Sequence, residues 1–151
     1  MVELFRHLFE FDAWANRRIA DAIDATPAVD AGAVKKLAHI MAAQDLWMRR
    51  LRGLDYTGFN PFPDHPLATV RKQIEDSAHD WTAYFATITD AQVAGKVAYR
   101  DTQGGQYETV MRDVLIQLYG HGLHHRGQIN LHIRQAGGKP APVDYMVYVR
   151  R

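Results

Sequence analysis

Apolar residues recur at three- and four-residue steps in four long segments of the chain, and this period constrains the fold more than any other feature. The segments cover about residues 2–25, 32–52, 67–89 and 108–136. The spacing matches the 3.6-residue turn of an α-helix, so each segment presents an apolar stripe to a core. Asp30 and Gly53 are typical of the two ends of the second helix. The pattern therefore predicts an all-α protein, a four-helix bundle.

Two stretches between these segments do not follow the helical pattern. Residues 53–66 are dense in Gly, Pro, Asn and Asp, which is typical of a loop. Within residues 90–108, KVAYRD and the following QYETV flank TQGG, which favours a short hairpin between the third and fourth helices. A chain of 151 residues fits one domain, so we expect a single helical-bundle domain over residues 1–151.

The composition excludes several classes of chemistry. The chain has no cysteine, which rules out disulfides, thiolate metal ligands and a cysteine nucleophile. Its net charge of +1 and scattered basic residues argue against nucleic acid as a partner. No stretch has the length of apolar sequence needed for a membrane span, and the N-terminal sequence lacks the apolar core of a signal peptide. We therefore expect a cytoplasmic protein with neither a nucleic-acid nor a membrane partner.

Eight histidines are present, and their placement in HGLHHRGQINLH, residues 121–132, is informative. At about 100° per residue, His121 and His125 lie on one face of the fourth helix, together with Val114 and Leu118, so this face is expected to be buried. His124 points about 80° to the side. Two imidazoles one turn apart can converge on a single ion, as they do in the HExxH motif.

A third ligand has to come from another helix, and His39 is the best candidate. It lies in the most apolar stretch of the chain, LAHIMAAQDLW, where small neighbours leave room around its ring. Gly122 stands where a metalloprotease of the HExxH type carries its Glu, so protease chemistry is excluded. The alternative is that the histidines are hydrogen-bonded core residues, but a buried pair of imidazoles needs several partners. The sequence thus predicts a metal site formed by His39, His121 and His125.

The chain resembles the DinB-like family of helical-bundle metalloproteins. The resemblance covers nearly the whole chain and is carried by four patches: FDAWANRRI (11–19), LAHIMAAQDLWMRRL (37–51), HGLHHRGQI (121–129) and IRQAGGKPAPVDY (133–145). It implies a four-helix bundle, a three-histidine metal site matched here by His39, His121 and His125, and usually a homodimer. Members of the family include thiol-dependent S-transferases and isomerases that use bacillithiol or mycothiol, while many others have no assigned activity.

Three hypotheses for function follow. The leading one is a metal-dependent enzyme, because three protein ligands leave a coordination position open. Three imidazoles suit zinc, nickel, copper or iron, and affinity order alone does not choose among them; we expect a divalent ion, zinc or nickel. Since the chain has no cysteine, a thiol would have to arrive as a cosubstrate, as in an S-transferase, while water would serve a hydrolase. The rivals are a non-catalytic metal-binding or damage-inducible stress protein, and a dimeric bundle with a vacant site.

The fourth predicted helix carries a second apolar stripe, which bears on whether the protein forms an oligomer. Leu115, Ile129 and Ile133, with Gly122 between them, are offset from the histidine face. A helix of a monomeric bundle rarely needs two stripes. The stripe therefore predicts a homodimer with the first and fourth helices near the interface.

Overall fold

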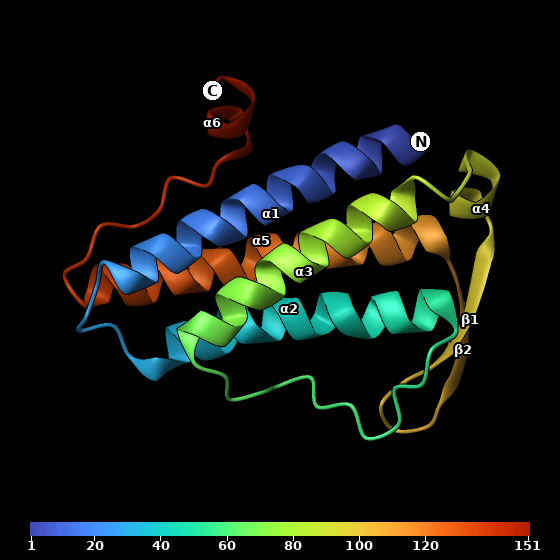
Figure 1. The fold of residues 1–151 in the computed structure, drawn as a ribbon, viewed down its shortest axis with the longest axis horizontal. Helices are drawn as coiled ribbons and strands as arrows, with labels where there is room; N and C mark the ends of the chain where they lie inside the picture. The colour runs from blue at the N-terminus through green and yellow to red at the C-terminus, as the bar shows by residue number, and fades with distance from the viewer.

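Helices form most of the protein in the computed structural model, which describes residues 1–151. The four long helices are α1 (Val2–Asp24), α2 (Ala31–Arg52), α3 (Leu67–Phe85) and α5 (Met111–Gln135). They lie side by side, and α1 and α2 each contact both α3 and α5 (Figure 1). The expected all-α class broadly fits, since the only sheet is a two-stranded hairpin. None of the helices is both long enough and apolar enough to cross a membrane.

The ends of α2 follow the local chemistry expected of them. The Asp30 carboxylate accepts a hydrogen bond from the Gly32 backbone N–H at 2.7 Å, as an N-cap residue does. Gly53 ends the helix with a φ of 64°, a left-handed conformation that suits glycine. Both predicted ends of this helix are confirmed, which fixes the position of His39 along it.

The end of α3 differs from the prediction. The helix ends at Phe85 rather than at residue 89, and a short helix, α4 (Asp90–Ala94), follows. Thr89 starts α4 through a capping box, in which its side chain accepts from the Gln92 backbone N–H and the Gln92 side chain accepts from the Thr89 backbone N–H. The capping box starts a new helix at Asp90 instead of extending α3, and the chain changes direction between the two helices.

The predicted hairpin is confirmed. Strands β1 (Lys96–Arg100) and β2 (Gln106–Val110) pair antiparallel, with Ala98 opposite Glu108. Because Glu108 belongs to β2, α5 begins at Met111 and not at the predicted residue 108. The hairpin lies at one end of the long helices (Figure 1), where Tyr99 packs edge-on against Trp47 with ring centroids 4.7 Å apart.

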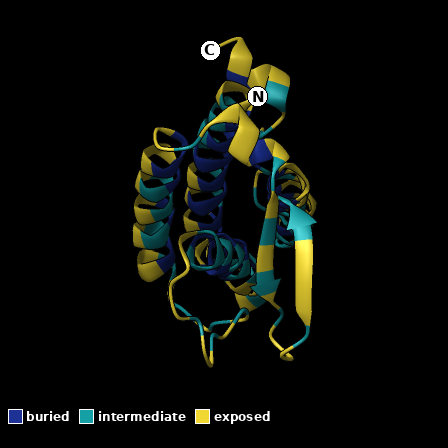
Figure 2. Cartoon of the chain, turned by 90° about the vertical axis from the view of Figure 1, so that its right-hand side faces the viewer, coloured by how far each residue is buried: buried dark blue, intermediate teal, exposed yellow.

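The core consists of two apolar clusters. Figure 2 shows the buried residues on the sides of the helices that face one another. One cluster gathers residues near the end of α1 and the start of α2, and the other gathers residues near the start of α1 and the end of α2. Between them, on the same helices, lie the buried polar residues Asp12, Asn16, Gln44 and Arg126. Along α2 and α5, this polar layer lies at about the same height as His39, His121 and His125.

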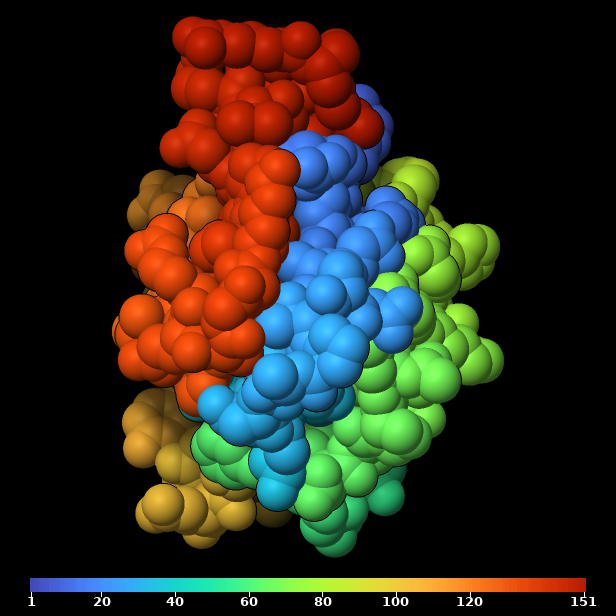
Figure 3. Space-filling view, turned by 90° about the vertical axis from the view of Figure 1, so that its left-hand side faces the viewer, coloured from blue at the N-terminus to red at the C-terminus, as the bar shows by residue number.

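The interpretation of a second stripe on α5 as an interface was wrong. Leu115, Ile129 and Ile133 are each 0% exposed and belong to the two core clusters of the monomer. The helix is bordered by α1 as well as by α2, so it needs two buried faces within one chain. After α5, the chain turns back and the short helix α6 (Tyr145–Val149) packs beside α1, as the red end of the chain in Figure 3 shows.

Candidate metal centre

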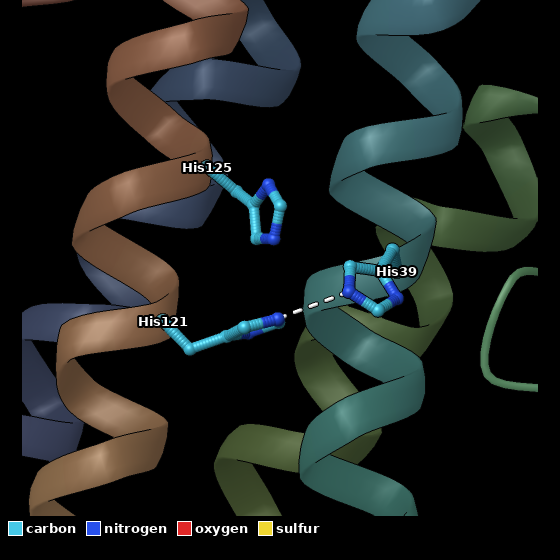
Figure 4. A group of neighbouring side chains, drawn as sticks. All are labelled: His39, His121 and His125. Carbon is cyan, nitrogen blue, oxygen red and sulfur yellow. Dashed lines mark hydrogen bonds between the residues drawn. The ribbon is translucent and has the colours of Figure 1, made fainter.

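The structure brings the three predicted histidines together. His39 lies on α2, and His121 and His125 lie on the facing side of α5. One ring nitrogen from each residue lies within 4.8 Å of the other two, and the Nε2 atoms of His39 and His121 are 3.0 Å apart (Figure 4). The expected closeness of His39 to the pair on α5 is therefore found, across 82 residues of sequence.

The pair on α5 has the arrangement that its spacing requires. His121 and His125 are one helical turn apart, and their ring centroids are 4.4 Å from each other. All three imidazoles are half-buried, so the cluster lies at the edge of the contact between α2 and α5 and not in the closed core. Such a position leaves part of each histidine exposed to solvent.

A backbone carbonyl fixes the tautomer of His39. Its Nδ1 lies 2.6 Å from the carbonyl oxygen of Pro61, in the loop between α2 and α3. A carbonyl oxygen can only accept, so Nδ1 carries the proton and Nε2 presents its lone pair to the cluster. The hydrogen bond between the two Nε2 atoms therefore uses a proton on His121 Nε2, which donates to His39 Nε2. A metal ion held by both nitrogens would compete with that proton.

Gln128 orients His125 in a similar way. The Nδ1 of His125 lies 2.9 Å from the Gln128 side-chain oxygen, and the Gln128 amide nitrogen donates to Nε2 of His124 at 3.0 Å. The amide oxygen therefore fixes the proton of His125 on Nδ1. The Nε2 of His125 is then unprotonated, and its lone pair can bind a metal ion. His124 itself is exposed and contributes no atom to the cluster of three.

The electrostatic surroundings favour neutral imidazoles. Burial, followed by the charges that His125 and His39 carry when protonated, lowers the pKa of His121 from 6.5 to about 4. Burial also lowers the pKa of His125, against the opposing effect of the hydrogen bond that its ring donates to Gln128. A metal ion needs unprotonated nitrogen, so these shifts prepare the ligands for a cation near neutral pH.

The donor set fits a divalent transition-metal ion. Nitrogen ligands at the usual bond length of about 2.0–2.1 Å lie about 3.3 Å from one another around a tetrahedral ion. The distances in the cluster are of that order, and small rotations of the rings would bring the nitrogens onto one centre. Two of the three rings already have a hydrogen-bonding partner on the nitrogen that faces away, as metal-bound histidines usually do.

A buried ion pair supports α5 directly behind the histidines. Arg126, which is 1% exposed, donates through Nη1 to the Asp12 carboxylate and to the Asn16 side-chain oxygen at 2.8 Å. The same carboxylate accepts from the Gln44 amide at 2.6 Å, which ties α1 to α2. The network therefore joins the three helices α1, α2 and α5 at the level of the site.

Sequence reasoning did not identify these supporting residues, although part of the signal is readable. Arg126 follows Gly122 by one turn, so it lies on the same core face, where a charged side chain needs a buried partner. Asp12 and Asn16 are likewise four residues apart, and both place a polar side chain on the buried face of α1. The contacts of Pro61 and of Phe62, whose ring stacks on His39 with centroids 4.4 Å apart, come from a loop without regular pattern.

The remaining histidine of the motif lies outside the site. The Nδ1 of His132 lies 2.6 Å from the Asp30 carboxylate at the start of α2. It therefore bridges α5 to α2 two turns beyond His125.

The sequence of this chain is similar to those of known proteins along nearly its whole length. The model of the DinB family matches the chain over residues 1–151. The chain is also similar to Protein DinB of Bacillus subtilis (strain 168), with 23% identity over 157 aligned positions that cover 94% of this chain and 91% of the relative. A match of this extent includes all four long helices and the three histidines, and from it we conclude that the chain belongs to the DinB family.

Proposed function

We propose that this protein is a metal-dependent enzyme related to the thiol-dependent S-transferases, with a divalent ion, zinc or nickel, held by His39, His121 and His125. The observation that carries the proposal is the convergence of three ring nitrogens from two helices within 4.8 Å. Only three protein ligands are present, which is the pattern of catalytic rather than closed structural sites. The helices α1, α2, α3 and α5 would then form a four-helix bundle of the DinB type around the centre.

The bound ion would supply Lewis acidity, which lowers the pKa of a thiol or water beside the three imidazoles. The protein's own groups orient the ligands: the Pro61 carbonyl holds His39 and the Gln128 amide holds His125. Phe62, which is 71% exposed, gives the open side of His39 an apolar wall against which a substrate can pack. Asp12 is bound to Arg126 and is therefore not available as a base.

The absence of cysteine makes a thiol cosubstrate necessary for S-transfer. A small thiol can enter from solvent because the cluster is only half-buried. Its sulfur would attack an electrophilic carbon of the second substrate, forming a carbon–sulfur bond while the leaving group departs with the bonding electrons and the thiol proton passes to solvent. A hydrolase that uses water at the same position is the alternative within the enzyme class.

The proposal is tested by coupling small thiols, including bacillithiol, mycothiol and cysteine, to monochlorobimane with protein loaded with zinc or nickel. We expect turnover by the wild type and by His124→Ala, and loss of turnover in His121→Ala. A large rise of melting temperature with metal, but no turnover on thiol or hydrolase substrates, would favour the rival, a non-catalytic metal-binding or stress-response protein. Equal rates in His121→Ala and the wild type would contradict the assigned site.

We further propose that the protein is a homodimer, as the family resemblance implies, but with a different face of α5 at the interface. The outer face carries an exposed stripe spaced at three and four residues: Ile116, Gly120, Leu123, Gly127 and Leu131. A Cβ added at Gly120 or Gly127 would meet no atom within 4 Å, so the two glycines leave room for another helix to approach. We expect Leu123→Glu to give a monomer by light scattering, whereas Leu54→Glu, in the exposed loop after α2, keeps the dimer. A monomeric wild type at micromolar concentration would contradict the proposal.

A further inference from the structure

A cavity of about 530 Å³ lies between α2 and α3, and none of the three histidines lines it. Its volume falls within the range of about 300–1,000 Å³ typical of small-molecule sites. Residues of the loop between the two helices, including Phe59, Asn60 and Pro63, form its outer wall. The same loop touches His39 through Pro61 and Phe62, so it separates the cavity from the histidine cluster.

The cavity lies mostly on the side of α2 that faces away from His39, although Ala42, three residues after His39, also borders it. Met48, which lines the cavity, follows His39 by nine residues, or two and a half turns of helix. Residues spaced in this way point in opposite directions from the helix axis. The cavity is therefore a second, separate place where this protein can hold a ligand.

The floor of the cavity is apolar with a fixed polar centre. Met41, Met48 and Trp81 line it and are all buried. At the centre, the Ser77 hydroxyl donates to the Gln44 side-chain oxygen at 2.6 Å. Since Gln44 also donates to Asp12 in the buried network, its amide is held in one orientation. The floor is thus preorganised for a compact, mostly apolar molecule.

The rim of the cavity is acidic. Asp45, Asp76 and Asp80 line it, and no lysine or arginine does. Asp45 is paired with Arg49, and Asp76 is paired with Lys72, both along their own helices. The carboxylate of Asp80 has neither an ion pair nor a hydrogen bond within the chain, and the nearby Arg52 donates instead to the Asp80 backbone carbonyl oxygen at 3.3 Å. Asp80 directly precedes Trp81, whose buried ring adds apolar surface to the cavity.

We propose that this cavity binds an organic cation with an apolar body, whose ammonium group lies beside Asp80 and whose body packs against Trp81 and Met48. The apolar floor selects the body, and the charge of the rim selects the head group. The site goes beyond the proposed metal chemistry and does not depend on it, because its residues share no side chain with the histidine cluster.

The test compares three probes that share a phenyl ring and differ in their head group: phenethylammonium, 2-phenylethanol and 3-phenylpropionate. Binding is measured by isothermal titration calorimetry at low salt. We expect the ammonium compound to bind at least fivefold more tightly than the alcohol, and the carboxylate to bind most weakly. Equal binding of all three, or preference for the carboxylate, would overturn the proposal.

Variants locate the probe. Asp80→Asn should weaken phenethylammonium about fivefold, as the loss of one close charge near a protein surface implies. The control, Asp64→Asn, removes a carboxylate of the loop between α2 and α3 that does not line the cavity and pairs with Lys35, and it should leave affinity unchanged. Ala42→Leu should fill the cavity and abolish binding of the probe. Binding that survives both Asp80→Asn and Ala42→Leu unchanged would place the probe elsewhere and refute the site.

The same titration on His121→Ala separates this site from the metal centre. We expect the variant to bind phenethylammonium as tightly as the wild type, whether or not it holds metal. Loss of binding in a folded His121→Ala protein would show that the cavity belongs to the histidine site, and would overturn its independence. Far-UV circular dichroism establishes that each variant is folded.

Discussion

Replacing Gly122 by alanine should destabilise the protein, although alanine is the better helix former. Gly122 is buried on α5, and a Cβ at this position would lie 2.6 Å from the Asp12 carboxylate and 2.9 Å from Arg126 Nη1. These atoms are ends of side chains, but they cannot move freely, because Asp12 and Arg126 bind each other inside the core. The substitution therefore forces apart a buried ion pair that joins α1 to α5.

The magnitude follows from three opposing terms. Overpacking a core costs about 1–3 kcal/mol. Breaking a buried ion pair by losing one partner costs about 3–5 kcal/mol, so a partial separation costs a fraction of that. The gain in helix propensity from glycine to alanine is about 1 kcal/mol. We expect a net loss of about 2 kcal/mol in the free energy of unfolding, or about 4–8 °C in Tm for a chain of this size.

Gly127 provides the matched control, five residues further along the same helix. It is exposed, and a Cβ there meets no atom within 4 Å. Gly127→Ala should therefore stabilise the protein by up to about 1 kcal/mol. Because Gly127 lies on the proposed dimer face, both substitutions are made in the Leu123→Glu protein, which we expect to be monomeric. They are compared with that protein by urea denaturation in the presence of a chelator, followed by circular dichroism. If Gly122→Ala stabilised the protein as much as Gly127→Ala, the close approach of Asp12 to α5 would be refuted.

Two further predictions concern the histidine cluster. Because the folded state lowers the pKa of His121 to about 4, the unfolded chain, whose histidines titrate near 6.5, binds more protons between these values. Stability of the metal-free protein should therefore be complete above pH 6.5 and fall by about 1–2 kcal/mol, after allowance for solvent screening, as the pH drops toward 4. Urea titrations at pH 7 and pH 5 should show this, with a smaller change in His121→Asn; an equal change in both proteins would contradict the assignment. Gln128→Leu should lower metal affinity about 10- to 100-fold without unfolding the protein, because it removes the partner that orients His125. Competition with a chromophoric chelator measures this affinity, and an unchanged value would exclude a positioning role for Gln128.

Much of the fold could be predicted from local sequence. The helical period gave the four long helices, and Asp30 and Gly53 gave the ends of α2, because capping chemistry acts within a few residues. The end of α3 was missed because an apolar residue, Ile88, continues the stripe beyond Phe85. The capping box of Thr89 and Gln92 is a readable signal that overrides it.

The clustering of the three histidines could be predicted for a similar reason. The groups that orient their rings could not. The spacing of His121 and His125 alone places them on one face, and the apolar surroundings of His39 place it on a buried one. The carbonyl of Pro61 could not be found in this way, since any residue has a carbonyl and only the course of the loop brings it to His39. The face of α5 that holds Leu115 and Ile129 was misassigned because periodicity shows that a face is apolar but not which neighbour covers it.

The cluster assignment is tested most directly by metal stoichiometry in four single variants. Purified metal-free proteins are loaded with zinc or nickel, dialysed at neutral pH and examined by elemental analysis. We expect one ion per chain in the wild type and in His124→Ala, and no stoichiometric ion in His121→Ala or His125→Ala. His39→Ala should bind metal more weakly and stay folded, because the apolar face around it remains. Retention of a full equivalent by His125→Ala, with its loss in His124→Ala, would contradict the account.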